Sequence, residues 1–113
     1  MSTLPAQNQM PATEVVRPKD LVRYQSGAVV SRTLLKRPTG TVTVFAFDEG
    51  QGLTEHTASF DALVQVIEGE AEFAIAGKPF KVRSDEAILL PANQPHAVTA
   101  LKSFKMLLTM IRS

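Results

Sequence analysis

The stretch LTEHTASFDALVQVIEGE, residues 53–70, contains His56, one of only two histidines in the chain. Its second half, ALVQVIE, is rich in valine and isoleucine and ends at a glycine, which predicts a β-strand followed by a tight turn. The other histidine, His96, stands in LLPANQPHAV, residues 89–98, between an apolar run and a proline-containing turn. His96 begins a predicted strand and His56 stands before one, and the fold decides whether the two meet.

Short apolar runs separated by turn residues fill the chain from Ala28 onward, which predicts an all-β domain. Several runs, such as TVTVFAF, are apolar on both faces and need cover on both sides, as in a sandwich or barrel with a partner on one outer face. DLVRYQ, near residue 20, is compatible with a short turn of helix. The predicted strands are AVVSRTLLK (28–36), TVTVFAF (41–47), ALVQVIE (62–68), AEFAIA (71–76), PFKVR (79–83), AILLP (87–91), HAVTALK (96–102) and FKMLLTMIR (104–112).

The composition fits one compact domain, with 113 residues, 44% of them hydrophobic and 20% charged. The net charge of +1, without a basic block, argues against a nucleic-acid partner. The absence of cysteine excludes disulfides and thiolate metal sites and fits a cytoplasmic protein. No apolar run is long enough to cross a membrane, and the N-terminus lacks the pattern of a secretory signal. We expect a flexible arm over residues 1–12, followed by a single domain over residues 13–113.

Two motifs around the histidines resemble those of the small single-domain cupins, the RmlC-like double-sheet jelly rolls. The first motif of that family runs glycine, five residues, His-x-His, three or four residues, glutamate, six residues and glycine. Its positions are filled here by Gly50, His56, Ala58, Ala62 and Gly69, without a gap. The IEGEAEFAIAG run that follows, residues 67–77, resembles the strand–turn–strand after the family's first site. The resemblance implies a jelly-roll barrel or sandwich.

The second motif of the family runs glycine, five residues, Pro-x-Gly, two residues, histidine, three residues and asparagine. Its positions are filled here by Asp85, Pro91, Asn93, His96 and Ala100. Aspartate and asparagine replace the two glycines. After glycine, these residues best tolerate a positive φ, because their short polar side chains can bond the local backbone. We therefore expect both turns to be kept.

The metal site that the resemblance implies is incomplete. It would take two histidines and a glutamate from the first motif and one histidine from the second, but Ala58 and Ala62 stand at two of these four positions. Most metal sites in proteins use at least three protein ligands. His56 and His96 therefore form an incomplete metal set. The strand parity of Ala58 and Ala62 predicts that both methyl groups face the same interior as His56 and leave room there.

Three interpretations of the two histidines remain open. In the first, they line a pocket for a small organic molecule, orient its carboxylate or carbonyl group, or act as acid and base. In the second, they bind a divalent transition metal (iron, manganese, nickel or zinc), completed by a residue not yet recognised, in an oxygenase or isomerase of a small carbonyl or carboxylate compound. In the third, they are structural histidines in a structural or regulatory dimer that has no ligand. The pocket predicted from parity contains His56, Ala58, Ala62, Val64, Val66, His96, Val98 and Met106, with Met110 as an alternative.

The partner implied by the resemblance to small cupins is a second copy of the chain. Strands that are apolar on both faces agree with this, since an outer apolar face needs a cover. We expect the outer strand faces, and the N-terminal segment with them, to make the contact. No cofactor is expected if the pocket is metal-free.

Overall fold

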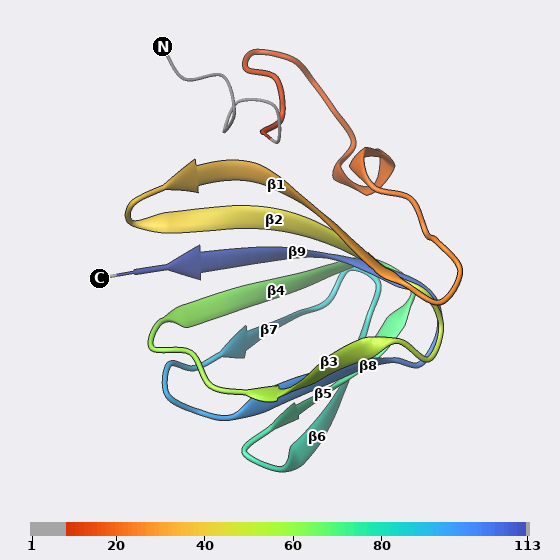
Figure 1. Cartoon of the computed structure of the whole chain (residues 1–113), viewed down its shortest axis with the longest axis vertical. Coiled ribbons are helices and arrows are strands. Elements are labelled where there is room, and N and C mark those ends of the chain that lie inside the picture. Colours follow the sequence, from red (N-terminus) through yellow and green to blue (C-terminus); the bar gives the residue numbers. More distant parts are fainter. Residues whose placement is uncertain (1–8, 113) are drawn as a thin grey trace.

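The computed structural model describes residues 9–112 and consists of nine β-strands in two antiparallel sheets (Figure 1). The five-stranded sheet has the order β1-β2-β9-β4-β7, and the four-stranded sheet has the order β3-β8-β5-β6. A single 3-10 turn, Pro18–Leu21, precedes them. The strands are β1 (Val29–Arg37), β2 (Gly40–Phe47), β3 (Gly52–His56), β4 (Asp61–Glu68), β5 (Glu70–Ile75), β6 (Lys78–Arg83), β7 (Ala87–Leu90), β8 (His96–Ala100) and β9 (Phe104–Ile111).

The predicted all-β jelly roll is confirmed, and the eight predicted runs correspond to eight of these strands. The sequence did not predict β3, because GLTEH is short and mostly polar, and four of its five residues are exposed. The 3-10 turn lies where DLVRYQ predicted a turn of helix.

The main core lies between the two sheets and is built around three phenylalanines. The Phe47 and Phe104 rings stack with centroids 4.5 Å apart, and Phe73 meets Phe104 edge-on at 6.5 Å. Phe73 comes from the four-stranded sheet and the other two come from the five-stranded sheet. Offset stacks and edge-on contacts of this kind add about 0.5–1.5 kcal/mol each beyond the burial of apolar area. The aromatic cluster therefore holds the two sheets together.

The turns at the two replaced glycine positions are kept, as predicted. Asp85 has φ 71° and Asn93 has φ 66°, both in the left-handed region. The amide of Asp85 donates to the carbonyl of Val66 at 2.8 Å, and the amide of Asn93 donates to that of Ala58 at 2.7 Å. The second of these bonds ties the loop before β8 to the loop after β3, so it helps to place the segments that carry both histidines.

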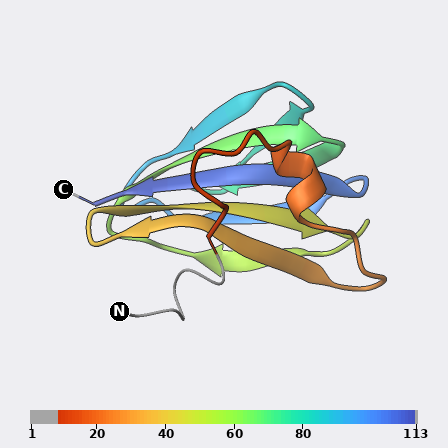
Figure 2. The ribbon, with the colours of Figure 1, turned by 90° about the horizontal axis from the view of Figure 1, so that it is seen from above.

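The described part of the N-terminal segment, residues 9–28, lies across the outer face of the five-stranded sheet (Figure 2). Val22 from this segment packs with Leu34, Val44 and Ala46 in a second buried cluster, joined by partly buried Met10, Leu21 and Tyr24. This packing explains part of the apolar outer face of TVTVFAF, since the chain covers Val44 and Ala46 with its own residues.

Polar contacts also hold this segment to the sheet. The Tyr24 hydroxyl donates to the Glu68 carboxylate at 2.5 Å, and Lys105 Nζ lies 4.9 Å from the centre of the Tyr24 ring while it donates to the Lys19 carbonyl. Burial and the Glu68 carboxylate raise the pKa of Tyr24, so the phenol stays protonated and donates. Within the predicted arm, the Met10 amide donates to the Leu34 carbonyl at 3.0 Å. The rest of the arm, residues 1–8, lies outside the described residues, and the predicted boundary stays a prediction.

Candidate functional site

His56 and His96, 40 residues apart in the sequence, lie side by side in the structure. His56 is the last residue of β3 and His96 is the first residue of β8, and the two are cross-strand partners. Their Nε2 atoms are 3.1 Å apart, and the ring centroids are 4.4 Å apart at an interplanar angle of 71°. The register of β3 shifts between Leu53 and His56, which places the His56 ring against His96 at the end of the ladder. The pairing expected from the motifs is therefore present in the fold.

The hydrogen bonds of the two rings define their tautomers. His56 Nδ1 lies 2.9 Å from the carbonyl oxygen of Thr54, and His96 Nδ1 lies 3.2 Å from that of Gln94. A carbonyl oxygen only accepts, so in both rings Nδ1 carries the proton and donates. In a neutral imidazole, the other nitrogen then has a lone pair. The two Nε2 atoms that face each other are therefore both acceptors, and no proton of a neutral ring lies between them.

A small apolar cavity of ≈ 70 Å³ extends from this histidine pair into the space between the sheets. Among the described residues, the only side chains with polar nitrogen or oxygen atoms in its lining are the two imidazoles, and no acidic or other basic residue joins them. His56 is exposed and His96 is half-buried, so the pair lies where the cavity meets solvent. The lining residues are Leu53, His56, Ala58, Ala62, Phe73, Leu90, His96, Ala97, Val98, Met106, Leu108 and Met110.

Six of the eight residues predicted for the pocket line this cavity, and so does Met110. The predicted residues Val64 and Val66 do not, because they lie farther along β4 and are 0% and 1% exposed in the core. Ala58 and Ala62 both face the cavity, as their parity predicted. The sequence missed several apolar wall residues. Leu90 is the cross-strand partner of Ala62, and Leu108 has the parity of Met106, so knowledge of the strand pairing would have found both.

A family model of the cupin domain matches residues 43–112, which include both histidines and the strands that carry them. The chain belongs to the cupin family. A conserved protein of unknown function from Streptococcus pyogenes is 32% identical, with a TM-score of 0.89 over 94% of this chain and 93% of that one. A cupin 2 conserved barrel domain protein from Leptotrichia buccalis is 42% identical, with a TM-score of 0.79 over 83% of this chain and 46% of that one.

A cupin superfamily protein from Desulfitobacterium hafniense is 22% identical and shares the fold, with a TM-score of 0.86 over 94% of this chain and 96% of that one. A comparison with curated proteins found no match.

The donor set of this cupin does not fit a resident metal ion. Among residues 9–112, no group of three or more histidine, cysteine, aspartate or glutamate side chains is placed to hold one. Asp61, the nearest acidic residue in sequence to Ala62, accepts a hydrogen bond from the amide of Ala92 at 2.8 Å. Two imidazoles remain, one fewer than the three protein ligands that catalytic zinc sites use. Among the described residues, the two imidazoles are the ionisable side chains that line the cavity.

Burial is the largest cause that lowers the pKa of His96, and the neighbouring His56 lowers it further, while the hydrogen bond to the Gln94 carbonyl acts in the opposite direction. His96 is thus held neutral at a pH where a free histidine begins to take up a proton. The site is an apolar cavity with an imidazole pair at its polar end, and the half-buried member of the pair resists protonation.

No helix in residues 9–112 has the length and apolar character needed to span a membrane.

Proposed function

We propose that this cupin binds a small, largely apolar molecule in the cavity between its sheets, with the polar end of the molecule against the imidazoles of His56 and His96. The observation that carries the proposal is the placement of two adjacent imidazoles at the open end of an otherwise apolar cavity. Ligand sites in proteins are typically apolar pockets with a few placed polar groups. A purely structural pair would not need a cavity beside it.

The small side chains of Ala58 and Ala62 support the same function. Both face the cavity from the loop and strand that follow His56. Protein interiors are close-packed and contain few voids larger than a water molecule. A void lined by two alanines next to a polar pair is therefore better explained by a ligand than by packing.

The test is a screen of small apolar compounds by thermal unfolding, followed by titration of those that raise the melting temperature, because a ligand that binds only the folded state stabilises it. His56→Ala and His96→Ala are expected to keep the fold and weaken binding. Ala58→Leu is expected to fill the cavity and abolish binding. Thr99→Ala is the matched control, since Thr99 lies on β8 with His96 but is exposed and does not line the cavity. Equal binding by all four variants would refute the proposal.

A metal-dependent enzyme, such as an oxygenase or isomerase, is the second candidate. Its one supporting observation is the arrangement of the rings, since metal-binding histidines commonly donate their other N–H to a backbone carbonyl, as both do here. Further ligands would have to come from water or the bound molecule. Metal analysis of tag-free protein decides: stoichiometric metal that is lost in both His56→Ala and His96→Ala would replace the metal-free proposal by this one.

We also propose that the outer face of the five-stranded sheet is a contact between two copies of the chain. One row of cross-strand partners, Leu35–Val42–Thr109–Leu63–Leu89, crosses all five strands on this face. Leu35, Leu63 and Leu89 are 43%, 38% and 55% exposed, although each is a large apolar side chain. The row contains no charged residue, and of its five members only Val42 packs against the cluster that the N-terminal segment covers.

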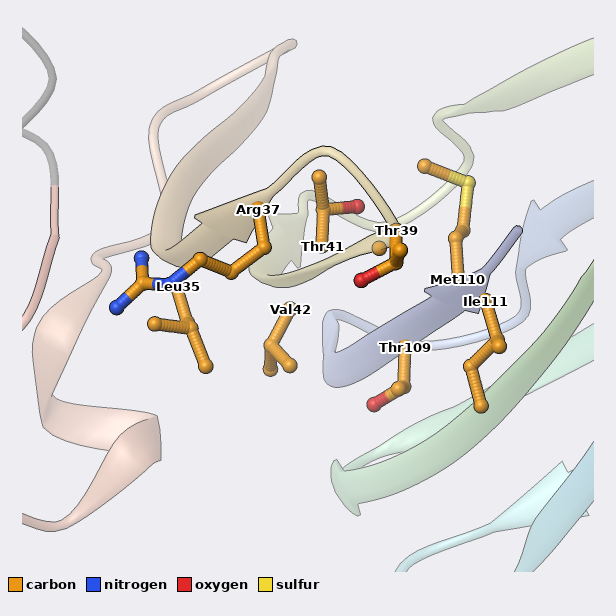
Figure 3. Close-up of a pocket in the computed structure, with 9 residues that line it drawn as sticks. Leu35, Arg37, Thr39, Thr41, Val42, Thr109, Met110 and Ile111 are labelled. Carbon is orange, nitrogen blue, oxygen red and sulfur yellow. The ribbon is translucent and has the colours of Figure 1, made fainter. Parts of the chain in front are cut away.

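The two ends of this row differ, since one lies beside a hollow and the other carries an exposed leucine. At the β1–β2 end, a hollow of ≈ 280 Å³ lies beside Leu35 and Val42; these side chains point to the same side of the sheet as Thr109 and Ile111 (Figure 3). At the β7 end, Leu89 is the most exposed member of the row. In a two-fold contact whose axis crosses the row at a right angle, each row runs opposite to its copy, so Leu89 of one copy meets the hollow of the other.

Light scattering after size-exclusion chromatography tests this contact. A dimer that Leu89→Lys converts to a monomer would support it, with Thr99→Lys, on the other sheet, as the control. A wild-type monomer, or a dimer that Leu89→Lys leaves intact, would refute it.

A further inference from the structure

The histidine pair also limits the kind of polar group that the cavity accepts, an inference that rests on the ligand-binding function proposed above. We infer that the bound molecule carries a hydrogen-bond donor, a hydroxyl group on a short apolar chain or ring, and that this O–H points between the Nε2 atoms of His56 and His96. The sequence alone allowed a carboxylate or a carbonyl at this place. The geometry favours a donor instead.

The argument begins at the far side of each ring. Both Nδ1 atoms are committed as donors, to the carbonyls of Thr54 and Gln94 at 2.9 and 3.2 Å. Both Nε2 atoms are therefore acceptors. In the part of the chain that the structure describes, the one group within hydrogen-bonding distance of either Nε2 is the other Nε2, at 3.1 Å. Two acceptors at this separation cannot bond each other, but both are within reach of a single donor placed beside them.

A proton added to either ring would place a net charge beside an apolar cavity whose lining contains no acidic residue. A carboxylate, ketone or ether would bring further lone pairs against the two that already face each other. A hydroxyl group instead supplies the missing proton without a net charge in the apolar cavity.

The size of the cavity limits the apolar part of the molecule. A volume of ≈ 70 Å³ is roughly five to seven times the 10–15 Å³ of probe volume that a single water molecule needs. Met106 and Met110 line the wall, and methionine side chains adapt their shape to what they contact. With the hydroxyl at the histidine pair, the molecule that fits is a short or cyclic alcohol of roughly three to five carbons.

The tautomers are tested first, in the free protein. Long-range proton–nitrogen NMR spectra of the imidazoles, recorded at about pH 8 where histidine is neutral, distinguish protonated from unprotonated ring nitrogens. The expected result is a protonated Nδ1 and an unprotonated Nε2 in both rings. A protonated Nε2 in either ring would place a donor between the rings and overturn the inference.

Matched pairs of compounds then separate donors from acceptors. 1-Butanol and diethyl ether have the same atoms, and cyclopentanol and cyclopentanone have the same ring, but only the alcohols donate. We expect each alcohol to bind at least tenfold more tightly than its partner in amide NMR titrations, which corresponds to about 1.4 kcal/mol. His96→Phe keeps an aromatic ring but removes one acceptor, and is expected to lose this preference. Thr99→Ala is expected to keep it.

Each outcome of the titrations decides a different point. Equal affinity for the alcohols and their partners in the wild-type protein would refute the donor inference and leave the ligand-binding function in place. No binding of any of the four compounds would overturn both. A preference that survives in His96→Phe would show that the pair does not read the hydroxyl, which also overturns the inference.

Discussion

Gly69, in the turn between β4 and β5, is the position where a single methyl group should disturb the fold most. Its φ is +82°, and a Cβ atom there would overlap the carbonyl oxygen of Ser103 and lie 2.7 Å from Cα and Cβ of Phe104. Gly77, in the hairpin between β5 and β6, also has φ +82° but nothing within 4 Å of the same position. The two glycines therefore have the same backbone conformation and differ in the space around it.

The expected loss of stability follows from these two terms. A left-handed conformation costs a residue other than glycine about 1–2 kcal/mol, and both Gly69→Ala and Gly77→Ala lose this amount. Gly69→Ala must in addition move Ser103 and Phe104, and overpacking of this kind costs about 1–3 kcal/mol. We expect Gly69→Ala to lose about 2–5 kcal/mol in total, a large part of the 5–15 kcal/mol that typically stabilises a domain.

The assay is urea unfolding of both variants and the wild type, followed by the loss of β-sheet circular dichroism. The midpoint of Gly69→Ala should fall well below that of Gly77→Ala at an unchanged slope. Equal losses in the two variants would refute the reasoning, because they would show that the contact with Ser103 and Phe104 carries no penalty. A variant too unstable to purify would agree with it only if Gly77→Ala is obtained normally.

Three further predictions follow from single contacts. Tyr24→Phe removes the hydrogen bond to Glu68 that holds the N-terminal segment, and should lower the free energy of unfolding by about 1 kcal/mol in urea titrations; an unchanged value would mean that apolar packing alone holds the segment. The folded-state pKa of His96 lies below its ordinary value of 6.5, so between these two values the unfolded chain binds more protons than the folded one. The free energy of unfolding should therefore fall as the pH drops through 6.5 toward the lower pKa. Urea midpoints in this range should fall less steeply for His96→Phe than for the wild type. Asn93→Gly should leave stability near that of the wild type, whereas Asn93→Ala should lose about 1 kcal/mol, since φ is 66° there; equal midpoints for the two would contradict this.

The fold could be predicted because its signals are local. Runs of β-branched residues between turn signals gave eight of the nine strands, and the preference of Asp85 and Asn93 for positive φ gave two turns correctly. The exception, β3, has only Leu53 as a partly buried residue, so its sequence carries no apolar pattern. It is a strand because it pairs with β8, and that pairing is not visible in its own residues.

The site could be predicted only in part, because strand parity gives the face of a side chain but not its depth. Val64 and Val66 share the inward face of β4 with Ala62, yet they pack into the core beyond the end of the cavity. The tautomers of the histidines depend on the carbonyls of Thr54 and Gln94, and the sequence does not show where a backbone carbonyl points.

From the sequence we predicted that a second copy of the chain covers the apolar outer face of the sheet. The residues before β1 supply part of that cover themselves, through contacts of Val22 and Tyr24 that no local pattern announces.

The two alanines at ligand positions allow one last prediction, about what separates this site from a metal site. Ala58 and Ala62 face the same cavity as the two imidazoles, whose Nε2 lone pairs are already free and whose Nδ1 atoms are already held. The missing part is a third and a fourth ligand. Ala58→His combined with Ala62→Glu is therefore expected to bind a divalent ion such as zinc or manganese stoichiometrically in equilibrium dialysis, although a glutamate at the buried Ala62 position destabilises the protein without the ion.

Addition of His96→Ala to this double variant is the control and should remove the binding. A folded double variant that binds no metal would mean that the alanines do not lie where ligands are needed, and the wild-type pair would then have to be explained without reference to a lost metal site.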